Sequence, residues 1–288
     1  MAKITTVIIG YEASQYLKLT LNSIEKALSK SLIQVVLVND GSLDATGDIM
    51  HEFANRLENV TYYNYHENRG LIFRQNQIIQ QLQTDIVHFL SSDDLILEDA
   101  YNSVNEIFSK YRNIHFLCGR TYIIDEFGNY LCHRPLIQPN NLYNLHRLSN
   151  TEKLKLFIDG DCYFFGNVTF WNLDFLKKSG GFNQSLYSWA DGVLTKNAVF
   201  MGQCYFLNEF LGCFRRHKNN WSNSPIKISL KEFQQTIDGF KETENENLQK
   251  LFSKYSILRN ESFEKIISAV IMKTKSPNSI DLVNILVA

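Results

Sequence analysis

Short apolar runs alternate with segments of helical periodicity along the first hundred residues. The runs are rich in β-branched and aromatic residues, as strands are, and they lie at 7–9, 35–38, 60–65 and 86–90. Between them, apolar residues recur at every third or fourth position, the spacing of one helical face, over 17–28, 49–57 and 71–82. Because parallel strands are joined by crossovers, this order predicts an α/β fold: a mostly parallel sheet with helices on both faces.

The remainder of the chain carries less regular patterns. A helix is predicted after Glu98 and a strand at 114–118, whereas 119–150 is polar and is typical of a loop or lid-like segment. Residues 160–222 are dense in aromatic residues and glycines without a regular period. After that stretch, helical periodicity returns. We therefore expect one domain followed by a C-terminal helical extension, over residues 1–222 and 223–288.

Composition limits the class of protein. Of 288 residues, 44% are apolar and 20% are charged, with a formal net charge of -1 and no block of Lys and Arg, which argues against a nucleic-acid partner. No apolar run approaches the roughly 20 residues that span a bilayer, and the first residues are strand-like rather than typical of a signal peptide. Five cysteines without a Cys-x-x-Cys pair favour reduced thiols over a zinc site. We expect a cytoplasmic protein.

Acidic residues follow two of the predicted strands. Asp93 and Asp94 come directly after the run at 86–90, with Ser91 and Ser92 before them, and Asp40 follows the run at 35–38. The carboxyl ends of parallel strands share one edge of the sheet, where ligands bind. Paired carboxylates there suit a hydrated Mg²⁺ or Mn²⁺ bound to a phosphate. The alternative is a set of helix starts, because acids and Asn-Asp-Gly-Ser turns also favour the first helical turn.

Two arginines flank a glycine ahead of the fourth strand. A guanidinium at Arg69 or Arg74 can clamp a pyrophosphate or a ribose. The alternative is a solvated charge on a helix, which fits Arg69 better than Arg74.

Two later segments also carry candidate chemistry. Asp191 follows Trp189-Ala190, where burial among aromatic residues would raise its pKa and suit it to act as a general base; alternatively it caps a helix. Arg215, Arg216 and His217 form a basic cluster that can bind a diphosphate, with His217 as a metal ligand. The alternative is an exposed basic turn.

Taken in order, these segments resemble the motifs of the family-2 glycosyltransferases, inverting enzymes with the GT-A fold. The resemblance covers about residues 4–222. It rests on six motifs. The first three are the opening strand and turn (6–12), the nucleotide-binding turn (38–42) and the segment before the metal motif (67–76). The others are the Asp-x-Asp motif (90–94), the Gly-Gly-Phe turn with the catalytic acid (180–191) and the closing Arg-x-His segment (214–217). Three positions depart from the family pattern: Gly10 stands in place of the usual proline, Ser91 replaces an acid, and Ala190 replaces a glutamate.

The resemblance implies a role for each site residue. It implies that Asp191 is the catalytic base, and that a divalent cation, Mn²⁺ or Mg²⁺, is bound by Asp93, Asp94 and His217. It implies that the nucleotide-diphosphate sugar is bound by Gly10, Tyr11, Glu12, Asp40, Arg69, Arg74, Ser92 and Arg215. Within the domain, residues 1–97 would form the nucleotide-sugar-binding half and 98–222 the acceptor half.

The reaction implied is transfer of a sugar, with UDP as the favoured carrier, to a hydroxyl of a glycan or lipid-linked glycan. Such enzymes build capsule, lipopolysaccharide and other bacterial surface polysaccharides, in the cytoplasm or at the inner face of the membrane. The C-terminal helices would pack on the core, pair with a second subunit or contact lipid. The rivals are a nucleotidyltransferase, a generic α/β ligand-binding domain, and a catalytically degenerate transferase serving as a binding or scaffold subunit, which Ser91 and Ala190 favour.

Overall fold

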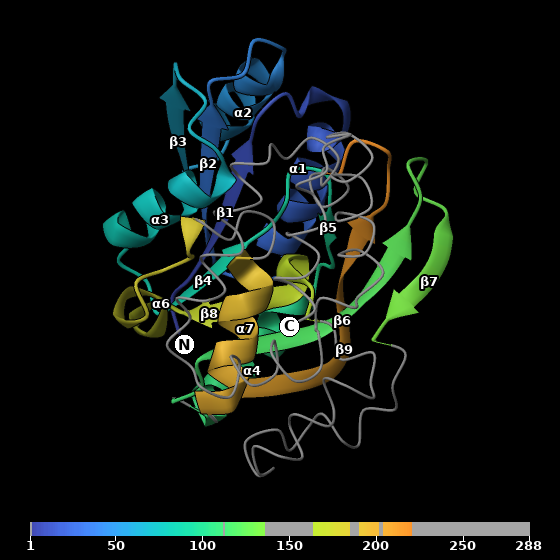
Figure 1. Cartoon of the computed structure of the whole chain (residues 1–288). Helices are drawn as coiled ribbons and strands as arrows, with labels where there is room; N and C mark the ends of the chain where they lie inside the picture. Colours follow the sequence, from blue (N-terminus) through green and yellow to red (C-terminus); the bar gives the residue numbers. More distant parts are fainter. Residues whose placement is uncertain (1, 112, 136–163, 185–189, 202–203, 221–288) are drawn as a thin grey trace, which may run out of the picture.

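The described strands form one mixed sheet. The computed structural model describes residues 2–111, 113–135, 164–184, 190–201 and 204–220. The sheet has the order β3-β2-β1-β4-β8-β6-β9-β5, and β7 pairs with β6 (Figure 1). The strands are β1 (Ile4–Gly10), β2 (Gln34–Asp40), β3 (Val60–Tyr65), β4 (Ile86–Phe89), β5 (Leu95–Ile96), β6 (Phe116–Ile124), β7 (Tyr130–Arg134), β8 (Thr169–Asn172) and β9 (Cys204–Arg215).

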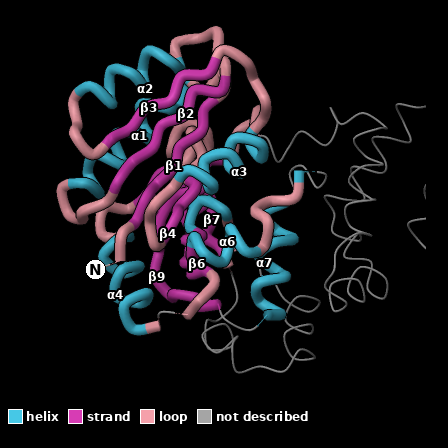
Figure 2. The backbone as a smooth tube through the Cα atoms, turned by 90° about the vertical axis from the view of Figure 1, so that its left-hand side faces the viewer, coloured by secondary structure: helices cyan, strands magenta, loops and turns pink. Residues whose placement is uncertain are grey.

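Helices cover both faces of this sheet. They are α1 (Ser14–Leu28), α2 (Thr46–Asn55), α3 (Leu71–Gln81), α4 (Ala100–Lys110), α6 (Leu173–Lys178) and α7 (Ala190–Met201), with the 3₁₀ turn η3 (Gly166–Val168) before β8. Figure 2 shows α1, α2 and α4 on one side of the strands and α3, α6 and α7 on the other. In the described part of the chain, no helix is both long enough and apolar enough to cross a bilayer.

The first four strands run parallel, as the sequence predicts. β1 pairs with β2 and β4, and β2 pairs with β3, all in parallel register. β1 is buried over its whole length, as expected for a central strand covered by helices on both faces, whereas the edge strand β3 has no buried residue and is exposed at Thr61, Tyr63 and Asn64. The predicted α/β fold is therefore confirmed. The predicted C-terminal helices at 223–288 lie outside the described residues.

The prediction of a loop from residue 119 is wrong for its first part. β6 continues to Ile124, and β7 returns beside it as a hairpin. The connecting turn is stabilised by the Asp125 carboxylate, whose Oδ1 accepts hydrogen bonds from the backbone amides of Phe127 (2.9 Å) and Asn129 (2.8 Å). Gly128 adopts a φ of 94° in this turn. Residues 136–150 of the predicted loop lie outside the described residues.

A polar cluster is buried beneath the sheet edge. His88 on β4 is fully buried, and its Nε2 lies 3.0 Å from the carbonyl oxygen of Asn167 in η3. Its Nδ1 lies 3.3 Å from the hydroxyl of Tyr101, which also bonds the hydroxyl of Thr6 at 2.7 Å. The His88 ring stacks on Phe170 with centroids 4.2 Å apart. Burial lowers the pKa of His88 to about 4 although the bond to Asn167 opposes the shift, so the imidazole is neutral in the folded protein.

Acid should therefore destabilise the protein through His88. The pKa of His88 is about 4 in the folded protein and about 6.5 in the unfolded chain. Its contribution to the free energy of unfolding is therefore complete above pH 6.5 and is lost as the pH falls towards 4. The full loss is about 3 kcal/mol. We expect the free energy of unfolding in urea to fall between pH 7 and pH 4.5 more steeply for the wild type than for His88→Phe. Parallel pH profiles for the two proteins would contradict this assignment.

Candidate functional site

The loops after β1 and β2 are joined at the carboxyl edge of the sheet. Glu12, at a φ of 50°, accepts a hydrogen bond from the amide of Leu43 through Oε1 (2.8 Å). Its own amide donates to Oγ of Ser42 (3.1 Å). The Glu12 carboxylate, predicted to contact the donor, therefore holds the neighbouring loop.

Asp44 also links the loops after β1 and β2. The amides of Ser14 and Thr46 donate to the two oxygens of Asp44 at 3.1 and 3.0 Å. Burial raises the pKa of Asp44, but hydrogen bonds from Ser14 and Thr46 outweigh it and lower the pKa to about 2. The carboxylate is thus ionised at neutral pH and fixes the start of α1 against the start of α2.

Gly10 and Tyr11 differ in what they offer a ligand. A Cβ on Gly10 would lie 2.8 Å from Cε of Met50 and 3.0 Å from Cγ2 of Thr46, so glycine lets α2 pack close to the end of β1 without displacing these side chains. Tyr11 is 50% exposed beside it. Of these two predicted donor contacts, Tyr11 presents a side chain at the edge, whereas Gly10 brings two elements together.

Asp40 and Arg74, predicted as donor contacts, bind each other. Nε of Arg74 lies 2.5 Å from Oδ1 of Asp40, and both side chains are almost fully buried. Asp40 also accepts the amides of Arg69 (3.1 Å) and Gly70 (2.8 Å). The pair therefore fixes the loop before α3, and the prediction that Arg74 is available as a pyrophosphate clamp is wrong.

The remaining donors of Arg74 are also engaged. Its two Nη atoms donate to Oε1 of Gln77 (2.8 Å) and the carbonyl of Glu67 (2.7 Å), and its guanidinium lies 3.6 Å from the Tyr65 ring centroid. Arg69 is exposed, with its guanidinium 3.8 Å from the centroid of the Phe73 ring. Of the two predicted arginines, Arg69 is the one whose charge reaches the surface.

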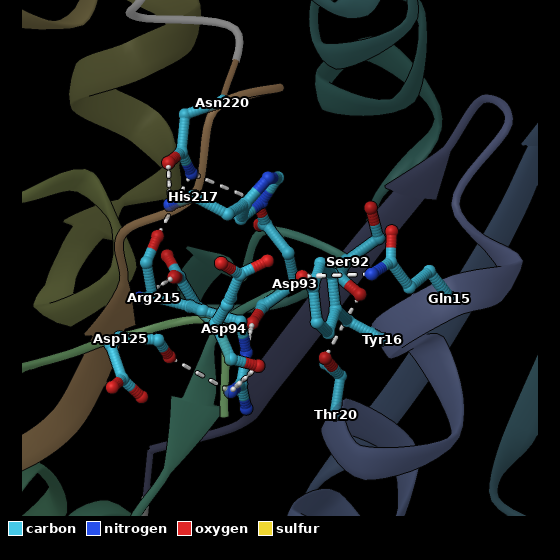
Figure 3. Close-up of polar contacts among 11 residues, drawn as sticks. Gln15, Tyr16, Thr20, Ser92, Asp93, Asp94, Asp125, Arg215, His217 and Asn220 are labelled. Carbon is cyan, nitrogen blue, oxygen red and sulfur yellow. Dashed lines mark hydrogen bonds and ion pairs between the residues drawn. The ribbon is translucent and has the colours of Figure 1, made fainter. Parts of the chain in front are cut away.

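Asp93 and His217 meet where β4 ends and β9 has just ended (Figure 3). Nε2 of His217 lies 2.8 Å from Oδ2 of Asp93. The His217 ring packs on Tyr16 of α1 with centroids 4.8 Å apart. The side chains of Asp93 and His217 are 24% and 10% exposed, so the pair lies at the surface of the edge and can be reached by a ligand. The carbonyl of Ser92 accepts the hydroxyl of Thr20 at 2.9 Å, which anchors the turn to α1.

Asp94 and Arg215 point into the protein instead. Asp94 is buried, and its Oδ1 accepts the backbone amide of Arg215 at 2.7 Å. Burial, and then the charge of Asp93, raise the pKa of Asp94 well above its usual value. The Arg215 side chain is also buried, and donates to the carbonyls of Asp93 (3.0 Å) and Asp125 (3.3 Å). The structure thus uses both residues to join β9 to the turn after β4, and the prediction that Arg215 binds the diphosphate is wrong.

The donor set fits a divalent cation with two protein ligands rather than three. In the described ranges, no three His, Cys, Asp or Glu side chains converge, because Asp94 turns away from Asp93 and His217. Oδ1 of Asp93 accepts no hydrogen bond from a described residue. One carboxylate and one imidazole at a solvent-accessible edge suit Mn²⁺, with donor phosphates and water completing the shell. A metal at Asp93 and His217 stays a prediction.

Asp191 lies at the start of α7 and is exposed. Its carbonyl accepts the hydroxyl of Thr195 (2.6 Å), and its Oδ1 accepts the amide of Gly192 (2.6 Å). A Cβ on Gly166 would lie 3.2 Å from Oδ2, so the turn before β8 passes close to this carboxylate. The expected burial of Asp191 is therefore wrong, whereas its role as base stays a prediction. Trp189 lies outside the described residues.

The Gly-Gly-Phe turn is attached to α3 by one side chain. Asn76 donates through Nδ2 to the carbonyl of Phe182 (2.7 Å) and accepts its amide through Oδ1 (2.8 Å). A Cβ on Gly181 would overlap Oδ1 of Asn76, so glycine permits this approach. Phe182 packs edge-on against Phe89 at the end of β4, with centroids 5.7 Å apart. Two sequence motifs thus meet at the same edge.

Sequence reasoning missed Tyr16 and Asn220, which both contact the Asp93–His217 pair. Tyr16 has the spacing of an ordinary buried helix residue, and Asn220 lies in a polar turn. The only feature of the sequence that could have indicated either residue is that it lies within a few positions of a motif.

Comparisons with known proteins agree with this arrangement. The sequence model of glycosyl transferase family 2 matches residues 5–171. The glycosyltransferase GlyA of Streptococcus pneumoniae serotype 4 is 34% identical over 110 residues, 38% of this chain and 16% of GlyA. The minor teichoic acid biosynthesis protein GgaB of Bacillus subtilis is 29% identical over 120 residues, 38% of this chain and 13% of GgaB. The chain thus matches less than a fifth of the length of these two relatives.

Solved structures share the fold at low identity. The mannosyltransferase PcManGT from Pyrobaculum calidifontis, in complex with GDP-Man and Mn²⁺, has a TM-score of 0.60 at 14% identity, covering 98% of this chain and 79% of its own. S. aureus TarS 1-349 in complex with UDP-GlcNAc has a TM-score of 0.57 at 15% identity, covering 94% and 84%. These likenesses confirm the GT-A fold. Because the family match covers more than half of its 288 residues, the chain belongs to glycosyl transferase family 2.

Proposed function

We propose that this protein transfers a sugar from a nucleotide-diphosphate donor to an acceptor hydroxyl with inversion at the anomeric carbon. The observation that carries the proposal is the Asp93–His217 pair, which lies at the carboxyl edge of the parallel strands, where α/β sheets bind ligands. The edge is pre-organised, because Glu12, Asp44 and Asp40 accept hydrogen bonds from the backbone amides of its loops.

The donor would lie along the ends of β1, β2 and β4. Tyr11 and Arg69 are exposed there and can face a base or a phosphate. Arg216 is exposed beside the buried Arg215, so the cation that this segment offers a diphosphate is Arg216. UDP is the carrier we favour, as in the UDP-GlcNAc complex of TarS.

Asp93 and His217 would hold the divalent cation. When bound, the cation supplies positive charge that offsets the negative charge developing on the departing diphosphate. Asp191, exposed at the start of α7, would accept the proton of the acceptor hydroxyl as its oxygen attacks the anomeric carbon. A single displacement with one base inverts the centre without a covalent sugar–enzyme intermediate.

The acceptor we propose is a glycan or lipid-linked glycan of a bacterial surface polysaccharide, made in the cytoplasm or at the inner face of the membrane. The similarity to GgaB, a teichoic acid biosynthesis protein, supports this class. A degenerate transferase that only binds is the second candidate, favoured by Ser91 and Ala190 where the family carries acids.

The test is a panel of nucleotide sugars, each assayed for thermal stabilisation of the protein and for slow donor hydrolysis. We expect one donor to raise the unfolding temperature more strongly with Mn²⁺ than without it, because binding to the folded state alone stabilises it. We also expect that donor to be hydrolysed. Stabilisation without hydrolysis or transfer would favour the binding subunit, and no response to any donor would overturn the proposal.

A further inference from the structure

Asn220 closes the turn that carries His217. Its Oδ1 accepts the backbone amide of His217 at 2.6 Å, and its backbone amide donates to the carbonyl of His217 at 3.2 Å. Its Nδ2 donates to the carbonyl of Arg215 at 2.9 Å. Asn220 is 5% exposed, so bulk water does not compete for these hydrogen bonds. One side chain thus sets the path of the chain from Arg215 to His217.

The same amide reaches the carboxylate across the site. Nδ2 of Asn220 lies 3.2 Å from Oδ2 of Asp93, 127 residues earlier in the chain. This is the oxygen that also contacts His217, and Figure 3 shows the three side chains converging. The hydrogen bond from Asn220 to Oδ2 restrains rotation of the carboxylate and leaves Oδ1 as the oxygen available to a cation. Asn220 is therefore hydrogen-bonded to both proposed ligand residues. It contacts the backbone of His217 and the carboxylate of Asp93.

We propose that Asn220 is a positioning residue for the divalent cation. The inference rests on the proposed function, because it requires a metal at Asp93 and His217. Because its amide is engaged by His217, Arg215 and Asp93, Asn220 would act on the ion only through the residues that hold it. Its amide holds Oδ2 so that Oδ1 of Asp93 is oriented for coordination, and the turn that it closes brings the His217 ring to the same place. Residues that hydrogen-bond to metal ligands typically change affinity by about 10–100-fold when removed.

An asparagine is required because both halves of the amide are used. The oxygen accepts from His217 while the nitrogen donates to Asp93, so a carboxylate at 220 would face Asp93 with like charge. A serine hydroxyl retains an acceptor for the turn but is too short to reach Asp93. Asn220→Ala and Asn220→Ser therefore remove the contact with Asp93 in two different ways.

The experiment measures Mn²⁺ binding directly, by electron paramagnetic resonance of the free ion, on the full-length chain. We expect Asn220→Ala and Asn220→Ser to raise the Mn²⁺ dissociation constant by about 10–100-fold. The matched control is Asn219→Ala, which changes the exposed neighbour of the same type and should bind Mn²⁺ as the wild type does. In sugar transfer, the Mn²⁺ concentration for half-maximal rate should rise in parallel, while kcat at saturating Mn²⁺ is largely retained.

Each outcome has a separate meaning. If the wild type and Asn219→Ala bind Mn²⁺ but the Asn220 variants bind it equally well, the inference is wrong and the proposed function stands. If the wild type binds no Mn²⁺, the proposed metal site itself is wrong. If Asn220→Ala unfolds, the Mn²⁺ affinity of the serine variant, which keeps an acceptor for the turn, decides whether the inference holds. A lowered kcat with unchanged Mn²⁺ dependence would reveal a structural role and overturn the inference.

Discussion

The Asp191→Asn variant should lose sugar transfer by about 10²–10⁴-fold, the usual contribution of a general base. Asparagine has nearly the same shape as aspartate, and its side-chain oxygen can still accept the amide of Gly192, so α7 should keep its start. Only the ability to take a proton is lost. Initial rates with saturating donor and acceptor measure the effect, and the unfolding temperature confirms that the fold is intact.

A matched control separates this role from helix capping. Asp174 is an exposed acid in the first turn of α6, so Asp174→Asn makes the same chemical change at another helix start. We expect its transfer rate to equal that of the wild type. Full turnover by a folded Asp191→Asn protein would leave Asp191 as a helix-start residue and remove the base from the proposed mechanism.

The largest loss of stability should follow from Asp40→Ala. The substitution leaves the Arg74 guanidinium buried with no counter-charge, removes the acceptor of the Arg69 amide, and leaves the Gly70 amide with only Oδ1 of Asn68. Breaking a buried ion pair from one side costs about 3–5 kcal/mol. The free energy of unfolding in urea should fall by that amount, whereas Glu52→Ala, an exposed acid on α2, should leave it nearly unchanged.

A double variant tests the cause. Replacing both partners, as in Asp40→Ala with Arg74→Met, removes the orphaned charge and should recover part of the lost stability. If Asp40→Ala instead keeps wild-type stability and loses only nucleotide binding, Asp40 is a ligand residue and its pairing with Arg74 is incidental.

The parallel half of the fold could be predicted from sequence because its signals are local. β2 is apolar and buried at consecutive positions, and α1 repeats apolar residues such as Leu17, Leu21 and Ile24 on one face. The hairpin of β6 and β7 was missed because its turn and polar strand positions resemble a loop. On its other side β6 pairs with β9, which lies about 90 residues later in the sequence, so this pairing had no local signal.

The site could be predicted only as a set of residue types. Asp93 and Asp94 are neighbours, yet one reaches the surface and the other is buried, and nothing in their spacing separates them. Arg215 and Arg216 show the same division. Which member of each pair points outward is set by partners elsewhere in the chain. The sequence therefore predicts where the site lies, whereas tertiary contacts decide which side chains in it are exposed to a ligand.

The contacts between the turn after β4 and the end of β9 join residues that are synthesised at different times. Asp93 and His217 are 124 residues apart, and β5 pairs with β9. At typical translation rates, roughly 6–25 s separate the emergence of these two residues from the ribosome. Throughout that interval Asp93 lacks its two partners His217 and Asn220. The nascent protein therefore cannot form the Asp93–His217 pair until residue 217 has left the ribosome.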